Sequence, residues 1–114
     1  MLWYEYRQNN SGGVYCGPAI NVFIEATNED VAAALAERLG VYFDGCSTGA
    51  DCDCCGDRWY RAYNGDEEKP KPYDFDMDRG VAVALYVYDN GKTVDFVGVP
   101  AGLDTQKISQ KLLT

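Results

Sequence analysis

Apolar and polar residues alternate in two stretches near the start of the chain. Residues 2–7 are rich in aromatic side chains, which favours a β-strand. Within residues 20–26, Ile20, Val22 and Ile24 occupy every second position, and Asn21 and Glu25 lie on the opposite face. This period of two predicts a second strand with one buried face.

The next stretch changes to a helical period. We expect a helix over residues 28–39, because apolar residues recur at every fourth position: Val31, Leu35 and Leu39. Thr27 followed by Asp30 resembles a capping box, so Thr27 is the predicted N-cap. Gly40 supplies a residue that readily ends a helix.

A hairpin is predicted in the second half of the chain. The apolar residues 81–88 and 93–99 flank a connection that contains Asn90 and Gly91. Because Asn-Gly readily takes the positive φ angles of a type I′ turn, we expect these two segments to pair as antiparallel strands.

Three further segments complete the prediction. Residues 41–43 are apolar and are interpreted as another strand, residues 64–78 as an exposed and proline-interrupted excursion, and residues 104–113 as a short C-terminal helix. The expected fold is therefore α+β, with a mostly antiparallel sheet of about five strands, one main helix packed on one face, a cysteine-rich loop and a C-terminal helix. We expect residues 1–114 to form a single domain.

Composition and charge argue against some classes of function. The chain has 114 residues, a net charge of -8 and no histidine, which excludes a histidine-based catalytic triad. An acidic surface repels phosphate backbones, so direct nucleic-acid binding is disfavoured. We see no signal peptide and no membrane span, and the five cysteines are an odd number. These features together predict a cytoplasmic protein that makes no membrane contact.

The cysteine-rich loop carries the densest chemistry. Cys52 and Cys55 form a C-x-x-C pair followed by Gly56, a pattern typical of a zinc knuckle. The predicted thiolate ligands of a structural zinc are Cys46, Cys52, Cys54 and Cys55, and alternatives for the fourth ligand are Cys16, Asp44 and Asp57. Two other interpretations stay open: a cysteine-rich turn that is only packed, and a catalytic thiol activated by a nearby arginine.

Two polar segments are candidates for ligand binding. The loop after residue 7 offers amide and hydroxyl groups that can hold a phosphate or a base edge. Residues 58–61 combine aromatic rings with guanidinium groups that can stack on a planar ligand. The candidate ligand-binding residues are Arg7, Gln8, Asn9, Asn10, Ser11, Arg58, Trp59 and Arg61. The alternative interpretations are a polar hairpin turn and a strand that buries Trp59.

Several of these segments also carry a family resemblance. They are residues 2–13 (LWYEYRQNNSGG), 23–26 (FIEA), 42–45 (YFDG) and 51–59 (DCDCCGDRW). Over the first half of the chain they resemble a family of small tailed-bacteriophage proteins without an assigned activity. The chain carries Asp53 where a proline is common in that family, and its fourth cysteine is not a regular family feature, which argues against a closed four-thiolate site.

The resemblance implies accessory work in the cytoplasm of an infected bacterium. Our preferred hypothesis is a counter-defence binding protein that blocks a host immune protein or sequesters a nucleotide signal. One alternative is a small enzyme that depends on zinc or a thiol. Another is an acidic nucleic-acid mimic or a structural interaction protein.

Overall fold

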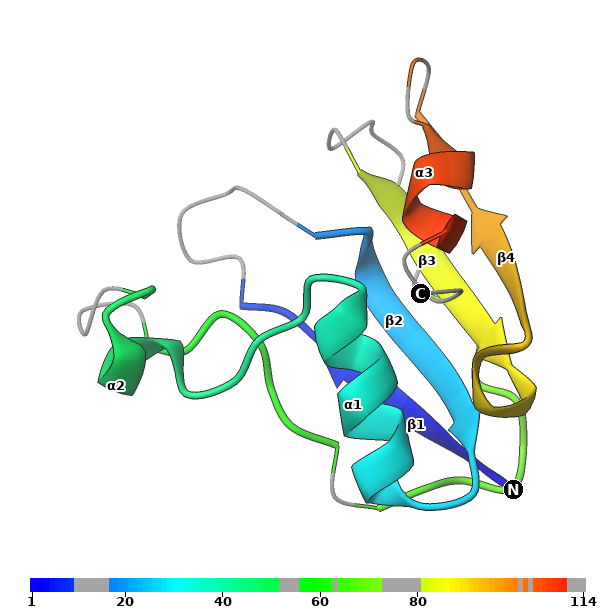
Figure 1. Cartoon of the computed structure of the whole chain (residues 1–114), viewed down its shortest axis with the longest axis horizontal. Coiled ribbons are helices and arrows are strands. Elements are labelled where there is room, and N and C mark those ends of the chain that lie inside the picture. The colour runs from blue at the N-terminus through cyan, green and yellow to red at the C-terminus, as the bar shows by residue number, and fades with distance from the viewer. Residues whose placement is uncertain are drawn as a thin grey trace.

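The sheet has four strands among the residues that are described (Figure 1). The structure is a computed structural model that describes residues 1–9, 17–51, 56–62, 64–72, 81–100, 102 and 104–110. Its strands are β1 (Leu2–Arg7), β2 (Ala19–Ala26), β3 (Ala82–Tyr88) and β4 (Thr93–Val97), which lie side by side in that order. β1 and β4 pair antiparallel with their neighbours, whereas β2 and β3 are parallel. The α+β prediction is confirmed. Two of the three strand pairings are antiparallel, as expected, and the parallel pairing of β2 with β3 makes the sheet mixed.

The strand predicted at residues 41–43 does not form, which accounts for the difference between five strands and four. The Val41 N–H donates to the Ala36 carbonyl at 3.0 Å, so this residue completes the end of the preceding helix instead of a sheet. Val41 and Phe43 are nevertheless buried in the main core. These two side chains are apolar because they pack in the core, and a coil segment can place side chains there as well as a strand can.

The main helix, α1 (Glu29–Arg38), begins one residue later than predicted. Its N-cap is Asn28, whose side-chain oxygen accepts a hydrogen bond from the Val31 N–H at 2.9 Å. The prediction of Thr27 as the N-cap was wrong, because the N–H and the hydroxyl of Thr27 form hydrogen bonds with Asn90 in the β3–β4 connection. The Asn90 carboxamide accepts from the Thr27 N–H and donates to the Thr27 hydroxyl, both at 2.9 Å.

The Asn28 cap gives a first testable prediction. Asn28→Ala is expected to lower the free energy of unfolding by about 1 kcal/mol, because it leaves an N–H of the first turn without its side-chain acceptor. Urea denaturation followed by circular dichroism measures this loss. Asn28→Asp keeps an acceptor and is the control, expected within roughly 0.5 kcal/mol of the natural protein. Equal stability of the alanine and aspartate variants would contradict the assignment.

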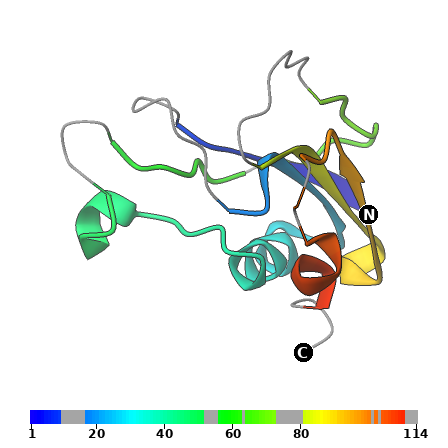
Figure 2. The same ribbon diagram turned by 90° about the horizontal axis from the view of Figure 1, so that it is seen from above.

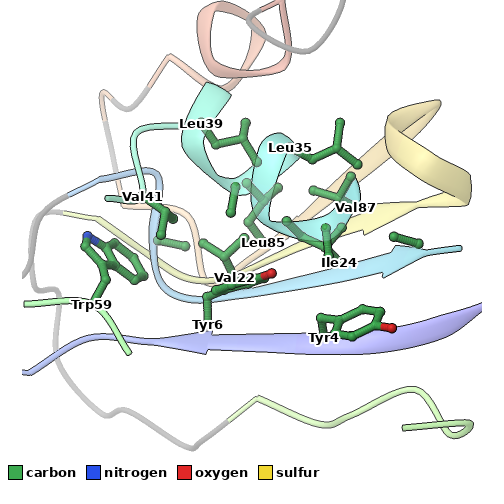
Figure 3. Packing of buried hydrophobic residues seen from close by; sticks show 14 of the residues in the cluster. Tyr4, Tyr6, Val22, Ile24, Leu35, Leu39, Val41, Trp59, Leu85 and Val87 are labelled. Atoms are coloured by element: carbon green, nitrogen blue, oxygen red, sulfur yellow. The ribbon is translucent and has the colours of Figure 1, made fainter. Parts of the chain in front are cut away.

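The main core lies between the sheet and α1 (Figure 3). Alternating residues of the strands point into it, and α1 contributes its apolar stripe. The larger buried side chains are Tyr4, Tyr6, Val22, Ile24, Leu35, Leu39, Val41, Trp59, Leu85 and Val87. The predicted core face of β2 and the apolar stripe of α1 are therefore confirmed, whereas the other face of β2 is buried as well, at Asn21 and Phe23.

The opposite face of the sheet carries a second, aromatic cluster of Trp3, Phe23 and Tyr86. Figure 2 shows residues 64–72 on this side and the helices on the other. Asp66 and Trp3 exchange two backbone hydrogen bonds of 2.7 and 2.8 Å, and the Tyr86 hydroxyl donates to the Pro70 carbonyl at 2.6 Å. Residues 64–72 are mostly exposed, as predicted, and these contacts also hold them as a strap over the sheet; residues 73–78 lie outside the described ranges.

The predicted hairpin is confirmed, but its turn differs from type I′. β3 and β4 pair from Ala84 with Val97 to Tyr88 with Thr93, which leaves four residues in the connection. A short 3-10 turn, η1 (Asp89–Gly91), fills it, and all three of its residues have positive φ. Beyond the hairpin, α3 (Thr105–Gln110) confirms the C-terminal helix over part of its predicted length. Within the described ranges, no helix has both the length and the apolar character that a bilayer crossing requires.

Candidate functional site

The two predicted ligand-binding segments lie side by side. The end of β1 runs antiparallel to residues 58–60: the Tyr60 N–H donates to the Arg7 carbonyl at 2.9 Å, and the Asn9 N–H donates to the Arg58 carbonyl. Gln8 and Trp59 form the bridge between these bonds. We call residues 7–9 with residues 58–61 the arginine seam. Asn10 and Ser11, the other predicted loop residues, lie outside the described residues.

Trp59 is a core residue, as one of the two sequence interpretations expected. Its side chain is only 2% exposed, and Figure 3 shows the indole at one end of the core with its nitrogen turned away from Tyr6 and Val22. Gly17, with φ +80°, leaves room for the ring, because a Cβ there would lie 2.9 Å from Cζ2 of Trp59. The indole N–H finds no hydrogen-bond partner among the described residues.

Gln8 anchors the seam to the sheet. Its side-chain amide donates to the Ala19 carbonyl at 2.9 Å, at the start of β2. Since this donor is used within the fold, the Gln8 side chain acts here as a support for the seam. Its neighbours Arg7 and Asn9 are exposed and half-buried, respectively.

Arg61 is the charged centre of the seam. Its guanidinium lies 4.4 Å from the centre of the Phe43 ring and 2.9 Å from the Asp44 carboxylate. Both charged side chains are well exposed, so the ion pair contributes at most about 1 kcal/mol to stability. The contacts orient the guanidinium more than they stabilise the fold.

Two hollows flank Arg61. The larger has a volume of about 280 Å³ and is lined by Asp44, Asp57, Trp59, Tyr60 and Arg61. The smaller has a volume of about 60 Å³ and is lined by Tyr6, Glu29, Asp30, Ala33, Phe43, Arg61 and Ala62. Arg61 therefore separates two spaces whose linings both mix carboxylates with aromatic side chains.

A carboxylate bracket holds the cysteine loop against the seam. Asp51 accepts hydrogen bonds from the Tyr42 hydroxyl at 2.8 Å and from the Arg58 N–H at 2.9 Å. Gly45, at the start of the short helix α2 (Gly45–Thr48), makes this possible, because a Cβ there would lie 1.7 Å from the Asp51 carboxylate. We call these groups the Asp51 bracket. It fixes both ends of the loop that contains the cysteines.

The predicted zinc ligands are only partly within the described structure. Cys46 lies half-buried in α2, whereas Cys52, Cys54 and Cys55 fall outside the described residues. Cys16, an alternative ligand, also falls outside them. In the part of the chain that is described, no group of three or more cysteine, aspartate or glutamate side chains could hold a metal ion. The zinc site therefore stays a prediction.

The two carboxylates considered as a fourth zinc ligand have partners in the protein. Asp57 accepts the Cys46 N–H at 2.9 Å, and Asp44 pairs with Arg61. Their oxygen atoms thus close the loop and orient the arginine. Asp51, by contrast, was not among the residues predicted for the site. The glycine at position 45 and the tyrosine at position 42 were the available signals for its structural role, but neither has a spacing specific enough to reveal it.

The seam also concentrates positive charge in an acidic chain. Arg7, Arg58 and Arg61 all belong to it, while the whole chain has 10 basic and 18 acidic residues. Asp44 pairs with Arg61, Asp51 accepts the backbone N–H of Arg58, and Asp57 lines the larger hollow together with Arg61. The arrangement presents cationic donors and carboxylate acceptors side by side, which suits a ligand that has both acceptors and donors.

No curated protein and no solved structure matches this chain. A family model described as a domain of unknown function, DUF7296, matches residues 1–109. Because this match covers nearly the whole sequence, the chain belongs to the DUF7296 family.

Proposed function

We propose that this protein is a small binding protein that takes a nucleotide-like ligand into the larger hollow of the arginine seam. One observation carries the proposal: a hollow of about 280 Å³ lies beside Trp59, Tyr60 and Arg61. Ligand pockets commonly have volumes of roughly 300–1,000 Å³; this hollow lies just below that range, which suits a small part of a ligand such as a base with part of its sugar.

The chemistry of the lining supports this ligand class. Asp44 and Asp57 offer carboxylate oxygens that can accept hydrogen bonds from the amino and imino groups of a base edge. Arg61 lines the same hollow and offers a guanidinium group for a phosphate of the ligand. A nucleotide combines these donors and acceptors in one molecule.

The biological setting follows from the resemblance to tailed-bacteriophage proteins. In that setting the protein acts in the cytoplasm of an infected bacterium and counters a host defence by sequestering a nucleotide signal. We favour sequestration over the blocking of a host protein because the hollow suits a small molecule. The hypothesis of a zinc- or thiol-dependent enzyme depends on cysteines outside the described residues and gains no specific support from the seam.

A thermal-shift screen tests the proposal. We expect at least one member of a panel of linear and cyclic adenine and guanine nucleotides to stabilise the protein. At a hundredfold excess over its Kd, such a ligand adds about 2.7 kcal/mol, which raises Tm by roughly 10 °C for a chain of this size. Arg61→Gln is expected to reduce this shift strongly, because it removes the charge at the centre of the site.

Arg38→Gln is the matched control, since Arg38 is an exposed arginine at the end of α1 and lines neither hollow. It should leave the nucleotide-dependent shift unchanged. The proposal fails if no nucleotide raises Tm, or if the Arg61 and Arg38 variants lose the shift to the same extent.

A further inference from the structure

The smaller hollow shares only Arg61 with the lining of the proposed nucleotide site. Its walls come from β1, from the first turns of α1 and from the segments around Phe43 and Arg61. Its volume of about 60 Å³ exceeds the 10–15 Å³ that one water molecule needs. It can therefore hold a small polar group with a short apolar stem.

A buried hydroxyl without a partner opens this question. Tyr6 lines the hollow and is only 1% exposed, and its hydroxyl has no hydrogen-bond partner among the described residues. Figure 3 shows Tyr6 rising from β1 into the layer between the sheet and α1. Buried hydroxyl groups are nearly always hydrogen-bonded in folded proteins. An unpartnered one points to a group that binds there.

The hydroxyl also lies in the field of charges around the same hollow. Burial is the main cause of the raised pKa of Tyr6, Glu29 raises this pKa further, and Arg61 opposes the rise. The phenol is therefore neutral near pH 7 and keeps its oxygen lone pairs available.

The remaining groups of the lining favour a cation. Glu29 and Asp30 contribute two carboxylates, whereas the single guanidinium, that of Arg61, is already paired with Asp44 at 2.9 Å. The partial positive charge at the start of α1, about half an elementary charge, is smaller than the charge of these two carboxylates. Acceptors thus outnumber unpaired donors around the hollow.

From this arrangement we propose that the smaller hollow binds a primary ammonium group, with the Tyr6 hydroxyl and the Glu29 and Asp30 carboxylates as its three acceptors. An ammonium group has three N–H donors and no acceptor, which matches this set. The Phe43 and Ala33 side chains contact the methylene stem beside it. The inference does not depend on the nucleotide site, since none of its three acceptors lines the larger hollow.

Titration with propylammonium chloride tests the proposal, with the backbone amide of Ala33 followed by NMR at constant ionic strength. We expect a saturable shift of this signal. Tetramethylammonium, which has the same charge but no N–H donor, is expected to produce no saturable shift. An equal response to the two cations would overturn the proposal, because the hollow would then respond to charge alone.

Two tyrosine variants isolate the hydroxyl. Tyr6→Phe keeps the ring that packs against Phe43, at a centroid distance of 5.8 Å, and is expected to remain folded. It should weaken propylammonium binding about fivefold, the loss expected for one hydrogen bond. Tyr4→Phe is the control, because Tyr4 is a buried tyrosine of the same strand that does not line the hollow. Equal affinities of the two variants would contradict the proposed role of Tyr6.

Further measurements separate this site from the nucleotide site and identify the source of the ammonium group. Arg61→Gln is expected to weaken nucleotide binding strongly and to retain or tighten propylammonium binding, whereas loss of both would overturn the assignment of the smaller hollow as a cation site. A basic peptide is then compared with the same peptide acetylated on its lysine side chains. Tighter binding of the unmodified peptide than of propylammonium indicates a lysine of a partner protein, and equal binding indicates a free amine.

Discussion

Trp59→Ala is expected to lower the free energy of unfolding by about 3–5 kcal/mol, because it empties the space of a large, fully buried side chain. The indole fills the end of the main core, and its backbone pairs with Gln8. Its loss removes apolar contacts and weakens the pairing of the seam with β1. Urea denaturation measures the change; it is followed by far-UV circular dichroism, because tryptophan fluorescence would be altered by the substitution itself.

Two further variants serve as comparisons for the Trp59→Ala result. Trp59→Phe keeps an aromatic ring and removes the unpartnered N–H, so it should cost clearly less than the alanine variant. Tyr60→Ala alters the adjacent residue, which is 53% exposed, and should change stability by no more than roughly 0.5 kcal/mol. If the Trp59 and Tyr60 alanine variants were equally stable, Trp59 would not be a core residue.

Asp51→Ala is the second change with a large expected effect. It removes the acceptor of the Tyr42 hydroxyl and of the Arg58 N–H, and hydrogen bonds to a charged group contribute roughly 1.5–3 kcal/mol each. Since Asp51 is half-buried, we expect a loss near the lower end of this range, about 3 kcal/mol in total. Differential scanning calorimetry of the variant measures it.

A double-mutant cycle with Gly45 tests the reason for this loss. A Cβ at position 45 cannot coexist with the Asp51 carboxylate in its present place, so Gly45→Ala should break the same two hydrogen bonds. The two changes are therefore expected to be strongly non-additive, with a coupling of at least about 1 kcal/mol. Additive losses would mean that the close approach of Gly45 and Asp51 is unimportant.

Local patterns predicted the elements that depend on nearby residues. The period of two in β2, the apolar stripe of α1 and the Asn90-Gly91 connection were all readable because each signal lies within one segment. The parallel pairing of β2 with β3 was not readable, since residues 27–81, about half of the chain, separate the two strands. Residues 41–43 misled the prediction because apolar residues of a buried coil resemble those of a strand.

The candidate site was predicted in its residues but not in its organisation. Arg7, Arg58 and Arg61 were named from their residue types, and only the antiparallel pairing brought them together. The roles of Tyr6 and Asp51 depend on contacts with distant residues, and no motif announces such contacts. Their chemistry therefore became visible only with the fold.

The parallel centre of the sheet links folding to protein synthesis. β2 is made early, yet its partner β3 leaves the ribosome only after the whole intervening crossover has been translated. At about 5–20 residues per second, the nascent chain waits for several seconds with one edge of β2 uncovered. A two-stranded sheet is marginal in water, so a chain truncated before Ala82 is expected to be captured by chaperones or degraded rather than to accumulate.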